Sequence, residues 1–158
     1  MATWDQVFRE GIAPQLTLDD LAALETALES DDPRLIQEGT THPPPLRSFE
    51  ECTVEGACAI GYAGWQGRSL ETVGAVENVF GKVCLETDRR MQEPTACRTF
   101  LSWFDSQPRA DVREKLLWVV RSVINRRRLD IDAAIEAESL PPCAGCGSTE
   151  ADCHAGCR

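Results

Sequence analysis

Four cysteines near the C-terminus carry the clearest chemistry in this sequence. Cys143 and Cys146 form a C-x-x-C pair, and Cys153 and Cys157 follow after a short run of small and polar residues. A zinc ion takes four thiolate or imidazole ligands in a tetrahedron, and a C-x-x-C turn directs two sulfurs at one ion. Because Cys153 and Cys157 are one helical turn apart, their thiolates can face the same side. These four residues therefore predict a structural Zn²⁺ site.

The choice of the fourth ligand stays open at this point. His154 lies beside Cys153, and its use in place of Cys153 restores a two-residue gap to Cys157. An iron–sulfur site, local disulfides and unliganded thiols are the alternatives to zinc. Four thiolates close the coordination sphere of zinc and leave no position for a reactive water, so we expect a structural role. So short a segment has almost no core residues, and the ion would be its main source of order.

The tail, PPCAGCGSTEADCHAGCR, resembles the short zinc-knuckle extensions of many small bacterial and phage proteins. Those extensions have the form C-x-x-C-G followed by a second Cys or His pair. This resemblance covers residues 143–157, and it implies a structural metal but no activity. The stretch over residues 54–124, with GYAGWQG and FLSWFDSQPR, is similar to uncharacterised bacterial helical proteins and likewise implies no activity.

The four cysteines upstream of this tail have a different interpretation. Cys58, Cys84 and Cys97 fall on or near apolar faces of predicted helices, where buried thiols are ordinary core residues. Cys52 is expected to be exposed and is the candidate for a reactive thiol. A cysteine enzyme would need a base such as His42, but any single Cys and His can be paired in this way. The sequence therefore contains no catalytic constellation.

The charge balance disfavours whole classes of partner. The chain of 158 residues has 26 acidic and 16 basic side chains, which gives a formal net charge of −10. Such a surface repels phosphate backbones and anionic lipids, so nucleic acid is a disfavoured partner. There is no run of about 18 apolar residues for a membrane span, and no N-terminal signal sequence. We expect a cytoplasmic protein with reduced thiols.

Helical periodicity dominates the chain upstream of the tail. Thr17 with Asp20, and Ser48 with Glu51, have the spacing of capping pairs at helix starts. The prolines between residues 40 and 45 predict a stiff extended connector. We find no strand-like alternation. The main predicted helices cover residues 18–30, 49–63, 70–91, 94–104, 108–128 and 130–139, with shorter helical pieces at 3–10 and 33–39.

These patterns predict an all-α fold, a bundle of about six or seven helices. The helical domain should cover residues 1–140, and the zinc-knuckle tail should cover residues 141–158. The boundary is set by Pro141 and Pro142, which end the last helix, and by the change to Cys, Gly and Ala after them. The sequence does not specify an oligomeric state.

Three hypotheses for function remain open. The first is a non-enzymatic protein-interaction or adaptor protein, whose bundle and zinc knuckle present surfaces to another protein. The second is a nucleic-acid-associated factor that uses the knuckle and Arg126–Arg128, with Arg109, Arg113 and Arg121 extending a basic stripe. The third is a helical enzyme with a reactive cysteine. The acidic surface and the absence of catalytic residues favour the first hypothesis.

Overall fold

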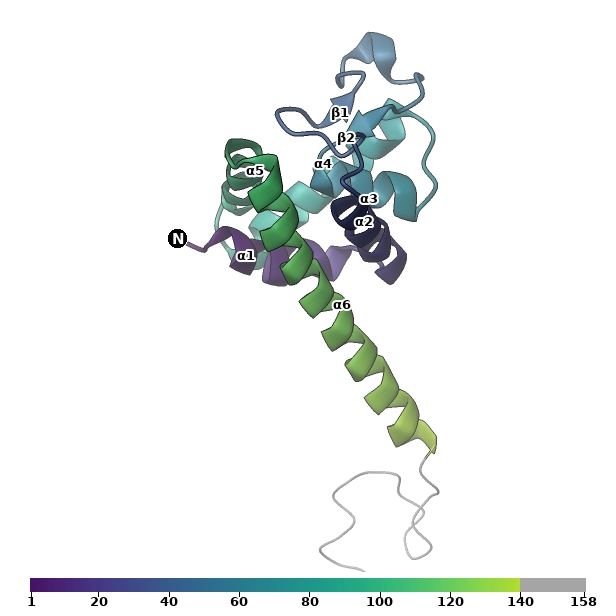
Figure 1. Cartoon of the computed structure of the whole chain (residues 1–158), viewed down its shortest axis with the longest axis vertical. Helices are drawn as coiled ribbons and strands as arrows, with labels where there is room; N and C mark the ends of the chain where they lie inside the picture. Colours follow the sequence, from purple (N-terminus) through teal and green to yellow (C-terminus); the bar gives the residue numbers. More distant parts are fainter. Residues whose placement is uncertain (140–158) are drawn as a thin grey trace, which may run out of the picture. The chain divides into compact units, whose positions relative to one another are not determined.

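The computed structural model describes residues 1–139, and within them the chain is mostly helical, as the sequence predicts (Figure 1). Contacts divide the chain into two units, Met1–Ile124 and Asn125–Arg158, each of which is described by itself. The elements are α1 (Trp4–Gln6), a π-helix η1 (Val7–Ile12), a 3-10 turn η2 (Ala13–Gln15), α2 (Leu18–Ser30), β1 (Thr41–His42), a 3-10 turn η3 (Arg47–Phe49), β2 (Gly56–Ala57), α3 (Ala59–Gly67), α4 (Val73–Met91), α5 (Ala96–Ser106) and α6 (Arg109–Ser139).

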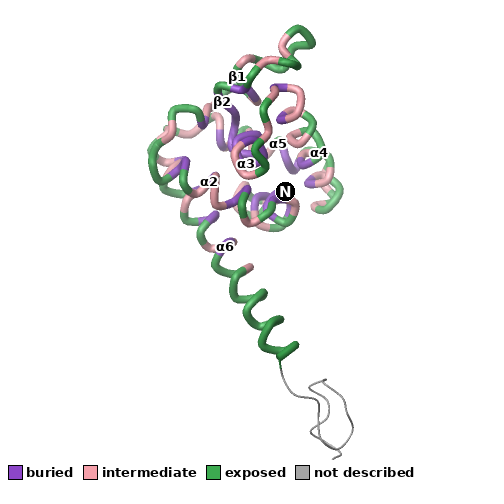
Figure 2. The backbone as a smooth tube through the Cα atoms, turned by 90° about the vertical axis from the view of Figure 1, so that its right-hand side faces the viewer, coloured by how far each residue is buried: buried purple, intermediate pink, exposed green. Residues whose placement is uncertain are grey.

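The core of the first unit is formed by the inward faces of its helices (Figure 2). Apolar residues that recur every three or four positions lie on one side of a helix, and this side packs against the neighbouring helices. Phe100 of α5 lies between two other buried rings, with centroids 5.5 Å from Phe8 and 6.1 Å from Phe104. Leu24 of α2 and Leu116 of α6 are also fully buried. The core therefore joins elements from both ends of this unit.

Helices α2 and α3 meet at an unusually close approach. The predicted capping box is confirmed, since the Thr17 hydroxyl accepts from Asp20 N and the Asp20 carboxylate accepts from Thr17 N. The same carboxylate is fully buried and accepts a hydrogen bond from Arg68 at 2.8 Å. A Cβ atom at Gly67 would lie 2.4 Å from the Asp20 Cα atom. Glycine is thus required where the end of α3 crosses the start of α2.

The predicted helix over residues 49–63 is wrong in its first part. The chain forms only the turn η3, then runs extended into β2, and α3 begins at Ala59. Strand β2 pairs antiparallel with β1, so the expectation of no strands is also wrong. Gly56 permits the pairing, because a Cβ there would lie 3.0 Å from Ile36 Cγ2. The β-branched residues Thr53 and Val54 also favour extended backbone over the helix that Ser48 and Glu51 suggested.

The short helix predicted over residues 33–39 is replaced by turns and by backbone pairing with β2. Ile36 N donates to Ala57 O, and Ala57 N donates to Arg34 O, both at 2.9 Å. These bonds satisfy backbone groups that a helix would otherwise have used. The small sheet and its flanking turns are therefore held by bonds between segments about twenty residues apart, a distance that local sequence patterns do not report.

The two helices predicted over residues 108–128 and 130–139 are one helix, α6. Asp130 does not cap a new helix, because no Gly or Pro interrupts residues 109–139 and the backbone continues unbroken. The predicted domain boundary at residues 140–141 lies outside the described residues and stays a prediction. None of the helices within residues 1–139 combines the length and the apolar character that crossing a membrane requires.

Candidate functional site

The predicted zinc ligands Cys143, Cys146, Cys153 and Cys157, together with the alternative ligand His154, lie outside the described residues. Within residues 1–139, no group of three or more His, Cys, Asp or Glu side chains is arranged to hold a metal ion. A metal site in the described part of the chain is therefore not supported, and the zinc site of the tail stays a prediction.

The buried cysteines of the helical unit are poor candidates for nucleophiles. Cys58 and Cys97 lie in the core, as expected, and the Cys97 thiol donates a hydrogen bond to Cys84 Sγ at 2.9 Å. Burial raises the pKa of Cys58 to about 12. The hydrogen bond to Cys84, together with burial, also raises the pKa of Cys97. Because the thiolate is the nucleophile, thiols that stay protonated at neutral pH are unreactive.

The remaining pair considered for cysteine chemistry is not assembled either. Cys52 is half-buried rather than exposed and packs against the core. His42 contacts the carboxylate of Glu55, with 3.3 Å between Nε2 and Oε2. A general base must lie within hydrogen-bond reach of the group that it activates, and His42 is engaged with an acid instead. The structure brings no cysteine and histidine of residues 1–139 together as a catalytic pair.

The part of the basic stripe formed by Arg109, Arg113 and Arg121 is bound at α2, whereas Arg126 and Arg128 are exposed. Arg109 donates to Asp31 at 2.7 Å, and Arg121 donates to Glu25 at 2.9 Å. Arg113 donates to carbonyl oxygens at the end of α2, which are unpaired at any helix C-terminus. These arginines complement the negative end of the α2 dipole and its acidic side chains. They fasten two helices together and do not form a free cationic surface for nucleic acid.

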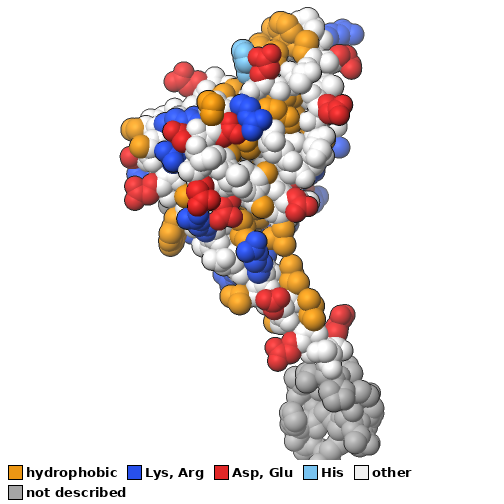
Figure 3. All heavy atoms as spheres, turned by 45° about the vertical axis from the view of Figure 1, so that its right-hand side comes forward, with side chains coloured by type: hydrophobic (Ala, Val, Ile, Leu, Met, Phe, Trp, Pro, Cys, Tyr) orange, Lys and Arg blue, Asp and Glu red, His pale blue; other side chains and the backbone are white. Residues whose placement is uncertain are grey.

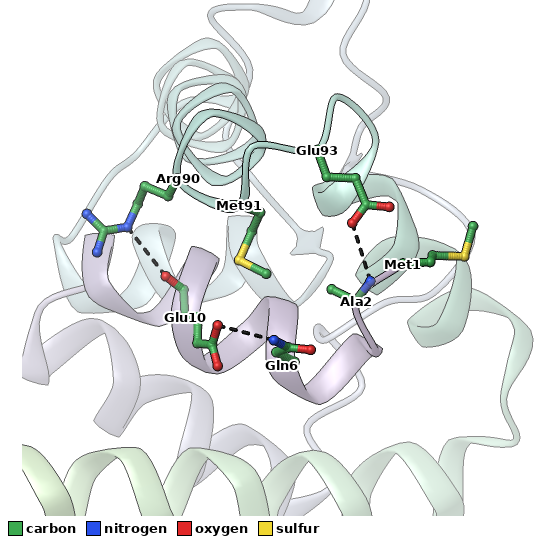
Figure 4. A pocket seen from close by; sticks show the side chains of 7 residues that line it. All are labelled: Met1, Ala2, Gln6, Glu10, Arg90, Met91 and Glu93. Carbon is green, nitrogen blue, oxygen red and sulfur yellow. Dashed lines mark hydrogen bonds between the residues drawn. The ribbon is translucent and has the colours of Figure 1, made fainter.

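Surface hollows within residues 1–139 are the remaining candidates for ligand binding. The first, close to the N-terminal residue, is shown in Figure 4 and is polar. Ala2 N donates to Glu93 at 3.3 Å, and Gln6 donates to Glu10 at 3.3 Å. Its polar groups therefore already bond to one another. The full lining comprises Met1, Ala2, Gln6, Glu10, Arg90, Met91 and Glu93.

The second hollow lies between α1 and the middle of α6 and has a volume of about 620 Å³. We name it the tryptophan groove, because two indole rings dominate its mainly apolar wall. Binding sites are usually concave, apolar and furnished with a few polar groups, which is the composition found here. Its lining consists of Trp4, Asp5, Glu114, Lys115, Leu117, Trp118, Val119 and Arg121.

The two tryptophans of the groove are held in different ways. The Trp4 ring stacks on Trp103 of α5, with ring centroids 3.5 Å apart and planes 3° from parallel. Trp118 is 67% exposed, and the Arg9 guanidinium lies over its ring, 5.1 Å from the centroid. Arg9 is itself held by a hydrogen bond to the Ser122 hydroxyl. The groove thus offers one fixed indole and one exposed indole supported by a cation.

The sequence contains a signal for this groove that periodicity alone does not reveal. The inward face of α6 uses Leu116, Val119 and Val120, all of which are buried. Trp118 falls outside this face, so the core does not account for it. A large apolar side chain outside the inward face of a helix indicates a binding surface, whereas one on the inward face is explained by core packing. The same reasoning could have identified Trp118 before the structure.

No protein-family model, no curated protein and no solved structure matches this chain. The first unit is accordingly defined by its own architecture, which is a mostly helical fold with a two-stranded sheet and an exposed aromatic groove.

Proposed function

We propose that this chain is a non-enzymatic protein-interaction protein and that the tryptophan groove binds a segment of a partner protein. The observation that supports this proposal is the exposed Trp118 beside the immobilised Trp4. A few Trp, Tyr and Arg side chains dominate the binding energy of protein interfaces. The stack on Trp103 lowers the entropy that Trp4 would lose on binding, which favours affinity.

The charges around the groove define the chemistry of the partner. Lys115 is paired with Asp111 at 3.3 Å, and Arg121 is paired with acidic residues of α2. Asp5 and Glu114 also line the groove, and the chain as a whole has a net charge of −10. We therefore propose a partner segment that inserts an aromatic or aliphatic side chain into the groove and carries Lys or Arg beside it. Complementary charge would speed association and select the partner.

The tail belongs to the same proposal. We propose that Cys143, Cys146, Cys153 and Cys157 hold one structural Zn²⁺, which would order the zinc-knuckle tail as a second contact surface. A cytoplasmic location, where thiols remain reduced, suits this metal site and the free thiols of the helical unit. The two other hypotheses are weaker, since the described cysteines lack an activating base, Arg109, Arg113 and Arg121 are bound at α2, and the net charge of −10 repels phosphate backbones.

A displayed peptide library selected against the full chain tests the groove. We expect the selected peptides to share an apolar anchor flanked by Lys or Arg. Trp118→Ala should weaken their binding by about thirtyfold or more, as expected for an interface hot spot. Leu85→Ala is the matched control, because Leu85 is 74% exposed on α4 and lies outside the groove. Circular dichroism should show that both variants are folded.

Two results would overturn the assignment. One is a set of peptides that bind Trp118→Ala as tightly as the native chain, which would place the binding surface elsewhere. The other is a set of peptides with no apolar anchor or with an excess of acidic residues, which would contradict the chemistry that we assign to the groove.

A further inference from the structure

A pair of thiols inside the first unit has chemistry that the proposed function does not use. Cys84 of α4 accepts a hydrogen bond from the Cys97 thiol of α5, and the two Sγ atoms are 2.9 Å apart. By contrast, the face of the first unit drawn in Figure 3 interleaves acidic, basic and hydrophobic side chains, so that face indicates no single class of ligand. The thiol pair is therefore the feature that requires a further explanation.

The position of the pair favours a bond between the two sulfurs. The S–S distance of a disulfide is about 2.05 Å, so the two Sγ atoms have to approach each other by only about 0.9 Å. The backbone beside them is already held, because Asp88 Oδ1 of α4 accepts a hydrogen bond from Cys97 N at 2.8 Å. The first turn of α5 is thus fixed against α4 with its thiol directed at Cys84.

The surroundings of the pair favour redox chemistry over the other roles of paired thiols. A metal ion needs further ligands, and within residues 1–139 no group of three or more His, Cys, Asp or Glu side chains is arranged to supply them. Cys97 is buried, whereas Cys84 is half-buried and is therefore the sulfur that a small solute reaches first. An accessible thiol beside a second, resolving thiol is the arrangement found at redox-sensitive cysteines.

We propose that Cys84 and Cys97 form a reversible disulfide when the chain meets hydrogen peroxide. The Cys84 sulfur attacks the peroxide, the O–O bond breaks, and the products are a sulfenic acid on Cys84 and one water. The Cys97 sulfur then attacks the Cys84 sulfur, the S–S bond forms, and the hydroxide that leaves takes the Cys97 proton as a second water. The two thiols thus lose two electrons, which reduce one peroxide. A dithiol reductant restores both thiols by exchange.

The disulfide would tie α4 to the first turn of α5. The two cysteines are 13 residues apart, and closing this loop restricts the unfolded chain, so the bond stabilises the folded state. Helix α5 also carries Trp103, on which Trp4 stacks, so oxidation would fasten the helix that supports the tryptophan groove. The inference itself depends neither on peptide binding in that groove nor on zinc in the tail.

Peptide mapping of the full chain after treatment with hydrogen peroxide tests the proposal. Free thiols are blocked with N-ethylmaleimide, and the chain is unfolded and digested with trypsin. Cleavage after Lys and Arg places Cys84 in the peptide 83–89 and Cys97 in the peptide 91–98, separate from the peptides 48–68 and 129–158 that contain the other six cysteines. We expect the peptides 83–89 and 91–98 to be joined, and dithiothreitol to separate them. Oxidation should also raise the melting temperature by about 5 °C or more, reversibly.

The controls separate this disulfide from other oxidation of the chain. Cys52→Ala is the matched control, because Cys52 is also half-buried but lies outside the pair, and this variant should keep the cross-link and the rise in melting temperature. Cys84→Ala should lose both, and the map of the native chain decides the assignment even if this variant does not fold. A Cys97 thiol that is still free after Cys84 is oxidised, a Cys84 thiol that peroxide leaves free, or a peptide 83–89 joined to the peptide 48–68 would each overturn the proposal. A melting temperature that rises equally in Cys84→Ala would overturn the stabilising role of the bond.

Discussion

Replacing Asp20 with alanine should expose how strongly a single buried carboxylate fixes α2 against α3. The Asp20 side chain is fully buried and accepts hydrogen bonds from Thr17 N at 2.9 Å and from Arg68 Nη2 at 2.8 Å. Alanine removes the acceptor for Thr17 N and the acceptor for the Arg68 guanidinium together, while the cap bond from Asp20 N to the Thr17 hydroxyl remains. Arg68 is then left partly buried without its counter-ion, so part of its desolvation goes uncompensated.

The expected loss of stability follows from these contacts. Loss of the capping-box hydrogen bond from Thr17 N costs about 1 kcal/mol, and loss of the hydrogen bonds between the charged groups of Asp20 and Arg68 costs about 1.5–3 kcal/mol. Arg68 is partly exposed and can regain some hydration, so we place the total at about 3 kcal/mol rather than at the upper limit for a buried pair. For a chain of this size such a loss lowers the melting temperature by about 6–12 °C.

Urea unfolding followed by circular dichroism measures this loss, and Glu25→Ala is the matched control. Glu25 is also an α2 acid bound to an arginine, but both partners are solvent-accessible, so its removal should cost less than about 1 kcal/mol. A double-mutant cycle with Arg68→Ala should show a coupling energy above about 1 kcal/mol. If Asp20→Ala costs no more than Glu25→Ala, the buried ion pair does not hold the two helices together.

Two further predictions concern the glycines and the tail. Gly67→Ala should destabilise the fold by at least about 2 kcal/mol, because its methyl group would meet the Asp20 backbone. Gly81→Ala should stabilise α4 by about 0.5–1 kcal/mol, because nothing lies within 4 Å of a Cβ atom at Gly81. Equal urea midpoints for the two variants would contradict both predictions. The purified chain should carry one zinc, and chelator competition should show loss of tight binding on Cys143→Ser, Cys146→Ser, Cys153→Ser or Cys157→Ser but not on His154→Ala. Metal that is lost from His154→Ala and kept by Cys153→Ser would establish the alternative ligand set.

Local signals in the sequence predict the helices well where interactions within the helix determine the backbone conformation. The Thr17–Asp20 capping box and the apolar periodicity of α2 and α4 identify their helices within a few residues. The Ser48–Glu51 pair has the same capping-box spacing, but no α-helix starts there. There the backbone of residues 52–54 pairs with residues 71–73, and that of residues 55–57 pairs with segments earlier in the chain, so tertiary bonds override the local preference.

The candidate site was less predictable than the fold for a physical reason. Periodicity assigns apolar residues to a core, so it gives no weight to Trp118, which lies outside the inward face of α6. The pairing of Trp4 with Trp103 links residues that are distant in sequence, and no local pattern encodes such a stack. The basic residues of α6 were visible in the sequence, but the binding of Arg109, Arg113 and Arg121 at α2 depends on the three-dimensional fold.

The contacts between the α6 arginines and α2 also determine when the first unit can fold during synthesis. Arg109 donates to Asp31, the C-cap residue of α2, which is 78 residues earlier, and Arg113 donates to Leu28 O, which is 85 residues earlier. While the chain emerges from the ribosome, the end of α2 must therefore wait for α6 before its carbonyl groups are paired. Contacts between such distant residues slow folding, because a long loop must close before they form. Nascent chains that end before residue 109 would leave this end of α2 and the core face beneath α6 open to chaperones.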